Sequence, residues 1–552
     1  MNALRRQSNI KFRRTAGVGV VAASVMIGAC TGFTGDDGSG GVGGTGGTGS
    51  PKTLSEIGGS VLPLRPLTPY ELRNTISDIL GDEAPEIAEL QPVAVAQGIE
   101  SLGGTGFLFE GAVADTLDDA FYRVASRVTT GKGMLSSCAA QTGSFECLKA
   151  LYADLLPRLH RGDPSVDTTI EALVKVATDN EVQLGRPDAI ARSLEAALLW
   201  PSLLYLTSIG SEGKPTGELS ALELASRMSY TAWSSAPDRD LLKAATSGML
   251  VSQAQIEGQA KRLLADPRSA RGISRFVLGW AGALNLGKRN KSAGKEWTAE
   301  IARDAVQESQ AFLSDWWLGA APTFSGLLNA DHSFVTERLA SYYGVPFPGG
   351  SGVQRVKWPS GSTRTGLLTQ ALWLAASSGS ERTSPTQRGR WVYERALCRT
   401  IVAPADIQGP DGPSHMANDQ TRDFHERLMT AKCSGACHTQ LEPLGFAFEG
   451  FDGIGRAQSV EAGRPVRTDA KPTTGSDIDA VYTDAKSFSR GLSASDTTLG
   501  CAAEYLAAHG LGRVVGEPDA ALTAQLKTGL RTNARDAMFA LISSPVFRRI
   551  AK

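Results

Sequence analysis

The spacing of apolar residues constrains the fold of this chain more than any other feature of its sequence. Apolar side chains recur near positions i, i+3, i+4 and i+7, whereas sustained alternation of apolar and polar residues is rare. Several of these stretches follow Thr, Ser or Asp, which cap helix N-termini. The pattern therefore predicts a mainly α fold of several packed helical modules. The clearest predicted helices are Glu71–Leu80, Arg192–Leu206, Ala221–Trp233, Ile301–Leu318, Pro385–Leu397 and Asp519–Leu530.

Connections rich in Gly and Pro suggest where the modules join. They lie near 210–217, 346–361, 404–413 and 462–476. The length of the chain also exceeds that of one simple core. We expect an N-terminal helical module at 61–135, a second at 136–210 that carries Cys138 and Cys147, a central module at 211–350, a module with a cysteine motif at 351–460, and a C-terminal helical module at 461–552.

The N-terminus has the features of an export signal. Arginines and lysines up to Arg14 precede an apolar run, Thr15–Ala29, that is too short to span a bilayer permanently. The run ends in Ile27-Gly28-Ala29-Cys30, which resembles a bacterial lipobox. The sequence thus predicts a lipoprotein signal peptide at 1–29, with Cys30 as the lipidated residue; ordinary secretion with cleavage after a small residue is the alternative.

Residues 30–60 are rich in Gly, Ser and Thr and contain almost nothing apolar, which predicts a flexible linker behind the lipidated cysteine. Thr31, in place of an aspartate, favours the outer membrane of a Gram-negative cell envelope, with the body facing the periplasm or the surface. We therefore expect the chain to contact the lipid bilayer through its N-terminal acyl anchor.

The charge balance of the chain argues against nucleic acid as a partner. The formal net charge is −1, and no stripe of basic residues stands out. After the signal, no apolar run approaches the roughly 18 residues that a transmembrane helix requires. No nucleophile elbow, P-loop or H-E-x-x-H helix is present either, so the sequence predicts no catalytic residues.

The segment Cys433-Ser434-Gly435-Ala436-Cys437-His438 is the strongest chemical signal in the chain. Two cysteines followed directly by a histidine is the arrangement that attaches haem c, although the usual spacing has one residue fewer between the cysteines. Under this interpretation Cys433 and Cys437 form the thioether bonds, and His438 is the proximal ligand of the haem iron. The alternative is a disulfide between the two cysteines, or two thiols beside a surface histidine.

Four further cysteines remain for the oxidising compartment that an export signal implies. Cys138 and Cys147 are separated by a short turn and form a natural local pair, which leaves Cys398 and Cys501 to join the C-terminal modules. The alternative is that all four are buried thiols.

The mature chain resembles large exported proteins of planctomycetes and myxobacteria that are built from domains of unknown function, of types 1587, 1595, 1592, 1588 and 1585, with a planctomycete-type cytochrome c-like motif. The resemblance implies one haem c in a cytochrome c-like segment near the C-terminus, and it names no reaction. It rests on the cysteine motif and on the segments 67–81, 201–205, 222–230, 235–238, 334–343, 364–369, 383–389, 444–446 and 449–456.

The chain departs from the family motif in its cysteine spacing and in having Glu442-Pro443 where Asp-Pro is usual. The family also tends to place a histidine shortly before the first cysteine, and the nearest one here is His425. The sequence therefore does not identify which residue is the distal ligand of the haem iron. The residues considered for it are Met416, His425, Met429 and His509, with a five-coordinate iron as the alternative.

These patterns lead to one main hypothesis and two alternatives. The main hypothesis is a cell-envelope lipoprotein with one c-type haem that carries electrons or supports a redox partner protein. The first alternative is a haem-free surface binding or scaffolding lipoprotein in which Cys433 and Cys437 form a disulfide. The second is a haem enzyme acting on an extracellular polymer.

Overall fold

The computed structural model describes residues 64–82, 84–88, 99, 111–131, 134–210, 217–284, 291, 296–380, 382–401, 415–416, 418–431 and 435–550. The predicted signal peptide, the linker, Cys30 and Cys433 lie outside these residues. Among the described residues, no helix combines the length and apolar character needed to cross a membrane.

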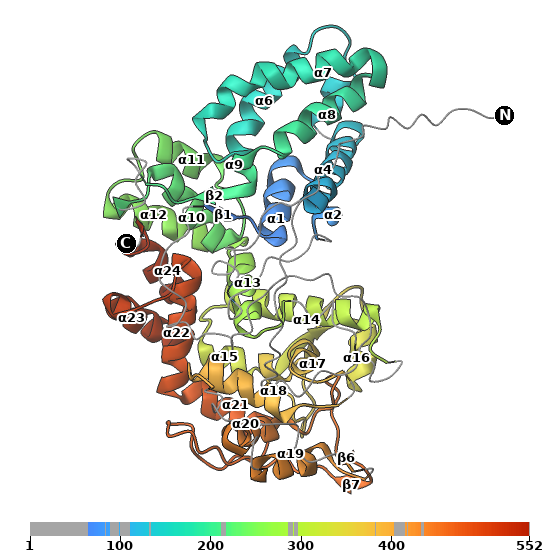
Figure 1. Ribbon diagram of the computed structural model, residues 1–552, viewed down its shortest axis with the longest axis vertical. Helices are drawn as coiled ribbons and strands as arrows, with labels where there is room; N and C mark the ends of the chain where they lie inside the picture. Colours follow the sequence, from blue (N-terminus) through green and yellow to red (C-terminus); the bar gives the residue numbers. More distant parts are fainter. Residues whose placement is uncertain are drawn as a thin grey trace, which may run out of the picture.

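The mainly α fold is confirmed: helices account for most of the described chain, and the strands are short and paired two by two (Figure 1). The N-terminal body occupies the upper part of Figure 1. It consists of β1 (Leu64–Pro66), α1 (Pro69–Leu80), α2 (Pro85–Ala88), α4 (Gly111–Thr130), α5 (Met134–Ala139), α6 (Glu146–Leu159), η2 (Pro164–Thr169), α7 (Ile170–Leu184), α8 (Arg186–Leu198), α9 (Pro201–Leu204) and β2 (Tyr205–Thr207).

The central part of the chain forms the middle of the molecule. It comprises β3 (Gly217–Glu218), α10 (Ala221–Trp233), α11 (Arg239–Thr246), α12 (Gln253–Ala265), α13 (Ser269–Trp280), α14 (Ala299–Leu318), α15 (Phe324–Asn329), β4 (His332–Val335), α16 (Glu337–Tyr343), β5 (Gln354–Lys357), η4 (Leu367–Thr369) and α17 (Ala371–Ala376).

The C-terminal part occupies the lower end and then returns upward along one side (Figure 1). Its elements are α18 (Pro385–Trp391), the wide helical turn η5 (Val392–Ala396), α19 (Thr421–Thr430), α20 (Gly435–Gly445), η6 (Phe446–Phe448), β6 (Val460–Glu461), β7 (Arg464–Pro465), α21 (Ala485–Ala494), α22 (Asp496–Leu511), η7 (Glu517–Asp519), α23 (Ala520–Thr532), α24 (Ala534–Ser543) and β8 (Arg549–Ile550).

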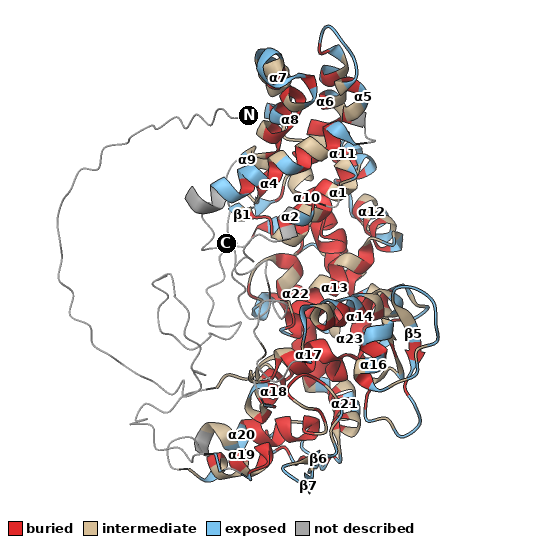
Figure 2. Cartoon of the chain, turned by 90° about the vertical axis from the view of Figure 1, so that its right-hand side faces the viewer, coloured by how far each residue is buried: buried red, intermediate tan, exposed pale blue. Residues whose placement is uncertain are grey.

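Two hydrophobic clusters hold these elements together. The N-terminal cluster is built around side chains such as Phe121 and Tyr152, and the main cluster runs through the central and C-terminal helices. Figure 2 shows the buried residues continuing along the length of the molecule. The two clusters meet at α10, where the hydroxyl groups of Tyr230 and Thr75 lie 3.0 Å apart.

The C-terminal end packs against the start of the central part, far away in sequence. β3 pairs with β8 in an antiparallel ladder, and α24 packs against α12. The main cluster therefore contains residues from the start of the central part and from the C-terminal end of the chain.

Helix α10 has the predicted bounds because local signals at its start agree with its apolar period. Ser220 and Glu223 form a capping box that satisfies backbone N–H groups at the N-terminus. The predicted helix Arg192–Leu206 is wrong as one continuous helix, because α8 ends at Leu198, the short helix α9 covers Pro201–Leu204, and Tyr205 begins a strand. Pro201 lacks an N–H group and disfavours helical backbone at Trp200, which is extended.

The i, i+4 spacing of Glu223 and Arg227 predicts an ion pair on α10, but the structure gives both groups other partners. The carboxylate of Glu223 accepts hydrogen bonds from the backbone N–H groups of Ile209 and Ser220. The guanidinium of Arg227 donates to the carbonyl oxygen of Phe547, 2.9 Å away. Arg227 thus joins α10 to the C-terminal end of the chain, and Glu223 holds the segment that leads into the helix.

Candidate metal centre

The helices α18, α19 and α20 at the lower end of the molecule bring the predicted haem ligand next to a second histidine. α20 packs against both of the other helices. The approach of α18 depends on two glycines: a Cβ at Gly389 would lie 1.9 Å from the carbonyl oxygen of Leu441, and one at Gly445 would lie 2.0 Å from that of Pro385. Any side chain at these positions would push the two helices apart.

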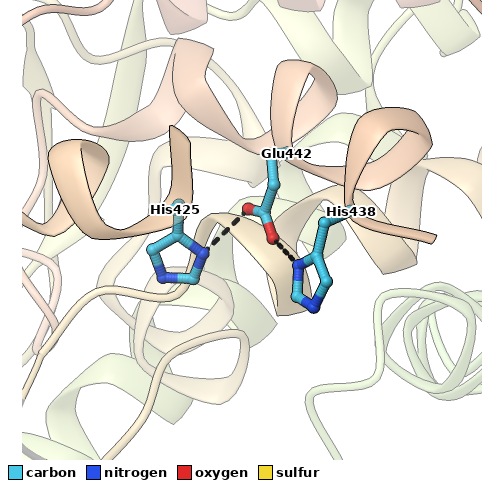
Figure 3. Close-up of side chains that lie close together, drawn as sticks. All are labelled: His425, His438 and Glu442. Carbon is cyan, nitrogen blue, oxygen red and sulfur yellow. Dashed lines mark hydrogen bonds and ion pairs between the residues drawn. The ribbon is translucent and has the colours of Figure 1, made fainter. Parts of the chain in front are cut away.

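The side chains of His425, His438 and Glu442 converge between these helices (Figure 3). His438 and Glu442 are four residues apart on α20 and so share one face, and His425 comes from α19. The Nδ1 atom of His438 contacts Oε1 of Glu442, and the Nδ1 atom of His425 lies 3.0 Å from Oε2. One donor atom from each residue can be chosen so that all three lie within 4.8 Å of one another.

The shared carboxylate is fully removed from solvent. The Glu442 side chain is 0% exposed, that of His425 is 5% exposed, and that of His438 is 18% exposed. Burial opposes ionisation of Glu442, but side-chain hydrogen bonds from His425 and His438, together with the electrostatic effect of His425, outweigh it and hold the pKa below its usual value. The site therefore contains a buried carboxylate that remains ionised between two imidazoles.

The two oxygens of this carboxylate have different environments. Oε1 contacts His438 and also accepts a hydrogen bond from Thr386 Oγ1, 2.5 Å away on α18. Oε2 is buried and lies 3.0 Å from His425 Nδ1, an ion-pair contact whose angles are not those of a good hydrogen bond. Thr386 Oγ1 also lies within hydrogen-bond distance of His425 Nδ1, at 3.2 Å. Oε2 is therefore the less well satisfied of the two oxygens, and an incompletely satisfied buried charge is costly.

The orientation of His438 fits the role of proximal haem ligand. When its Nδ1 atom carries the proton and donates it to the carboxylate, the lone pair that a haem iron could use is on Nε2. Histidines that bind metals commonly hold their second nitrogen in this way. Cys437 precedes it in the first turn of α20 and is half-buried. The described residues of the cysteine motif therefore suit a c-type haem, while Cys433 lies outside the described residues.

The residues considered for the distal position are dispersed by the fold. Met416 is exposed, Met429 packs against the main hydrophobic cluster, and His509 lies on α22 with its ring against Phe276. His425 is close to His438, but both rings face the same carboxylate. Because Glu442 holds the Nδ1 atoms of both rings, the structure presents His425 as a partner of Glu442 and does not identify it as the distal ligand of a haem at His438.

A buried ion pair fixes the chain directly after α20. Arg388 of α18 donates to the backbone carbonyls of Phe448 and Phe451, and its guanidinium lies 3.2 Å from the Glu449 carboxylate. Both side chains are almost fully buried, and burial raises the pKa of Glu449 to about 7. α18 thus orders the second half of α20 through Gly389, and the chain that follows α20 through Arg388.

The remaining cysteines form two disulfides in the pairs considered from the sequence. Cys138 is bonded to Cys147 in the N-terminal body, with Cα atoms 5.6 Å apart. Cys398, shortly after η5, is bonded to Cys501 on α22, with Cα atoms 5.4 Å apart. The second bond joins the segment that leads to the metal centre to the returning C-terminal helices.

Sequence reasoning identified His438 and considered His425 only as a distal ligand; it did not recognise the three-residue cluster. One signal was available, since a histidine and a glutamate at i, i+4 on one helix form half of a common metal-binding pattern. The contributions of His425 and Thr386 depend on how three separate helices pack, which residue spacing does not reveal.

Comparison with known families supports part of the resemblance noted above. Residues 219–345 match the family model PSD4, a protein of unknown function (DUF1592), and residues 364–461 match PSCyt3, a protein of unknown function (DUF1588). The second match contains α18, α19 and α20 and therefore the whole metal centre. No curated protein and no solved structure matches the chain.

Proposed function

We propose that the chain is a lipid-anchored protein of the cell envelope that carries one c-type haem and transfers electrons to or from a partner protein. The observation that supports it is the position of His438: it follows Cys437 in the first turn of α20, and its Nδ1 atom is held by the buried carboxylate of Glu442. The family match over residues 364–461 agrees with a module built around this motif.

In this proposal Cys433 and Cys437 hold the haem by thioether bonds and His438 binds the iron through Nε2. When bound, the haem supplies one-electron transfer. Glu442 keeps the Nδ1 proton of His438 in place and so fixes the ring and its tautomer. Thr386 orients Glu442 by donating to the same carboxylate oxygen.

The same side chains also set the electrostatics at the site. A carboxylate that accepts the Nδ1 proton makes the imidazole a stronger donor, and a buried negative charge favours the more positive state of a nearby metal. Glu442 would therefore favour the oxidised form of the haem iron. The rest of the helical body restricts the access of solvent and offers a surface for docking.

The location of this chemistry follows from the N-terminal sequence. Lipidation at Cys30 would anchor the chain in the outer membrane, and residues 31–60 would connect the anchor to the helical body. The redox partner would then be another envelope protein.

A visible spectrum tests the proposal. The protein is purified from native membranes, or from a host that co-expresses cytochrome c maturation factors, and is reduced with dithionite. Haem bands that survive denaturation are expected for the natural chain, and Cys437→Ser is expected to lose covalently bound haem. A colourless natural chain from both sources would refute the proposal and leave the haem-free scaffold, with a Cys433–Cys437 disulfide, as the function to pursue.

A further inference from the structure

We propose that His425, His438 and Glu442 bind one Zn²⁺ ion when the chain carries no haem. Two imidazoles and one carboxylate form the donor set of many three-residue zinc sites, which leave a further position for water. The three side chains come from two packed helices and offer donor atoms within 4.8 Å of one another. The inference goes beyond the proposed haem function and does not depend on it.

The environment of Glu442 is the second observation that points to a cation. Its side chain is 0% exposed, and Oε2 has an ion-pair contact with His425 Nδ1 at 3.0 Å but no well-directed hydrogen bond from the described residues. A bound cation would satisfy this oxygen and offset the cost of burying the negative charge. The nearby nitrogen donors favour a first-row transition ion over Ca²⁺ or Mg²⁺, which prefer oxygen ligands.

Zinc would use the nitrogen atoms that already face the carboxylate. The Nδ1 atoms of His425 and His438 would donate their lone pairs to the ion, and the proton on each ring would reside on Nε2. Each ring then remains neutral. Haem binding uses the opposite nitrogen of His438, so the two states require different tautomers of one histidine.

The fold also provides support around the three ligands. Thr386 donates to Oε1 of Glu442 from α18, a typical outer-shell contact of a metal-bound carboxylate. His425 precedes Cys433 in the chain and His438 follows it, so one ion would join the two helices that flank the cysteine. We infer that zinc holds α19 and α20 together around the cysteine motif before haem is attached.

The test uses the full exported chain from a host without cytochrome c maturation factors, stripped with a chelator and then titrated with Zn²⁺ or Co²⁺. One equivalent of Zn²⁺ should remain after dialysis, and Co²⁺ should give visible d–d absorption that Zn²⁺ displaces. His425→Ala and Glu442→Gln should weaken binding by more than about 100-fold, because outer-shell changes alone cost about 10- to 100-fold. Thr386→Val, which changes only an outer-shell contact, should weaken Zn²⁺ binding by about 10- to 100-fold.

One control variant and one control measurement accompany the test. His415→Ala removes an exposed histidine that stacks on Phe424, next to the cluster but outside it, and should bind Zn²⁺ normally. Glu442→Gln keeps the shape of the side chain, so an unchanged far-ultraviolet dichroism spectrum would show that lost binding is not lost folding. Absence of bound Zn²⁺ in the natural chain, or equal affinity in all variants, would refute the site.

One further variant separates this inference from the haem proposal. Cys437→Ser should lose covalent haem but keep Zn²⁺, since the three zinc ligands are intact. His425→Ala should lose Zn²⁺ but keep every residue of the haem-attachment motif. Loss of Zn²⁺ binding in Cys437→Ser would refute the three-residue site, whatever the result for haem.

Discussion

Replacing Cys398 and Cys501 together by alanine should lower the free energy of unfolding of the main hydrophobic cluster by about 4.7 kcal/mol. The bond closes a loop across a sequence separation of 103 residues. In the chain-entropy model, the loss of unfolded-state entropy is about 2.1 + 1.5R ln n cal/mol/K, which gives about 4.7 kcal/mol at 25 °C for this loop.

The second disulfide provides a matched comparison within the same chain. Cys138 and Cys147 have a sequence separation of only 9, so the same expression gives about 2.6 kcal/mol. Cys138 lies in the N-terminal cluster and Cys501 in the main cluster, so each bond should act on the transition of its own cluster. The difference of about 2 kcal/mol is a firmer expectation than either value, because local packing losses at the cysteines partly cancel.

Hydrogen exchange followed by mass spectrometry at increasing urea concentrations would measure both effects, since it gives an opening free energy for peptides of each cluster. The two double-alanine variants are compared with the natural chain, and the reduced natural chain serves as a control that should reproduce both losses. Equal losses in the two variants, or a larger loss for the Cys138–Cys147 pair, would refute the argument from loop length.

Three further substitutions test the packing around the metal centre and the central part of the chain. Gly389→Ala should destabilise the chain by about 1–3 kcal/mol, measured by urea unfolding, and weaken Zn²⁺ binding, because the new methyl group would overlap the backbone of α20. Glu308 is buried and has a pKa raised to about 7, so its stabilising contribution is full below about pH 4.5 and is lost as the pH rises through 7. Glu308→Gln should therefore remove about 3 kcal/mol of pH dependence from the unfolding free energy in that window. Arg388→Met should cost about 3–5 kcal/mol in urea unfolding at pH 8, because Glu449 loses its buried cationic partner and must either take up a proton or hold an uncompensated charge.

The sequence predicts those elements whose signals are local. Helix α10 begins after Ser220 and ends at Trp233 because a capping box and an apolar period agree on the same bounds. The predicted helix Arg192–Leu206 is divided at Trp200, because the apolar period continues across Pro201 whereas that proline disfavours helical backbone at the residue before it.

The partners of charged groups were harder to predict because they come from distant parts of the chain. The spacing of Glu223 and Arg227 is correct for an ion pair, yet Glu223 binds backbone N–H groups and Arg227 binds a carbonyl oxygen 320 residues away. Likewise, the spacing of His438 and Glu442 is visible in the sequence, whereas the approach of His425 requires α19 to pack on α20. Local spacing therefore predicts half of the metal centre and the tertiary packing supplies the rest.

The unusual cysteine spacing does not alter the relative positions of His438 and Glu442. The extra residue lies between Cys433 and Cys437, whereas the contacts that orient His438 come from Glu442, on the C-terminal side of the histidine. α20 begins at Gly435, so Cys437, His438 and Glu442 all lie within one helix. Because the helical period fixes their relative positions, an insertion before Cys437 leaves the histidine and its carboxylate unchanged. The spacing therefore bears on how the first thiol reaches a haem, and not on whether the chain can bind a metal at His438.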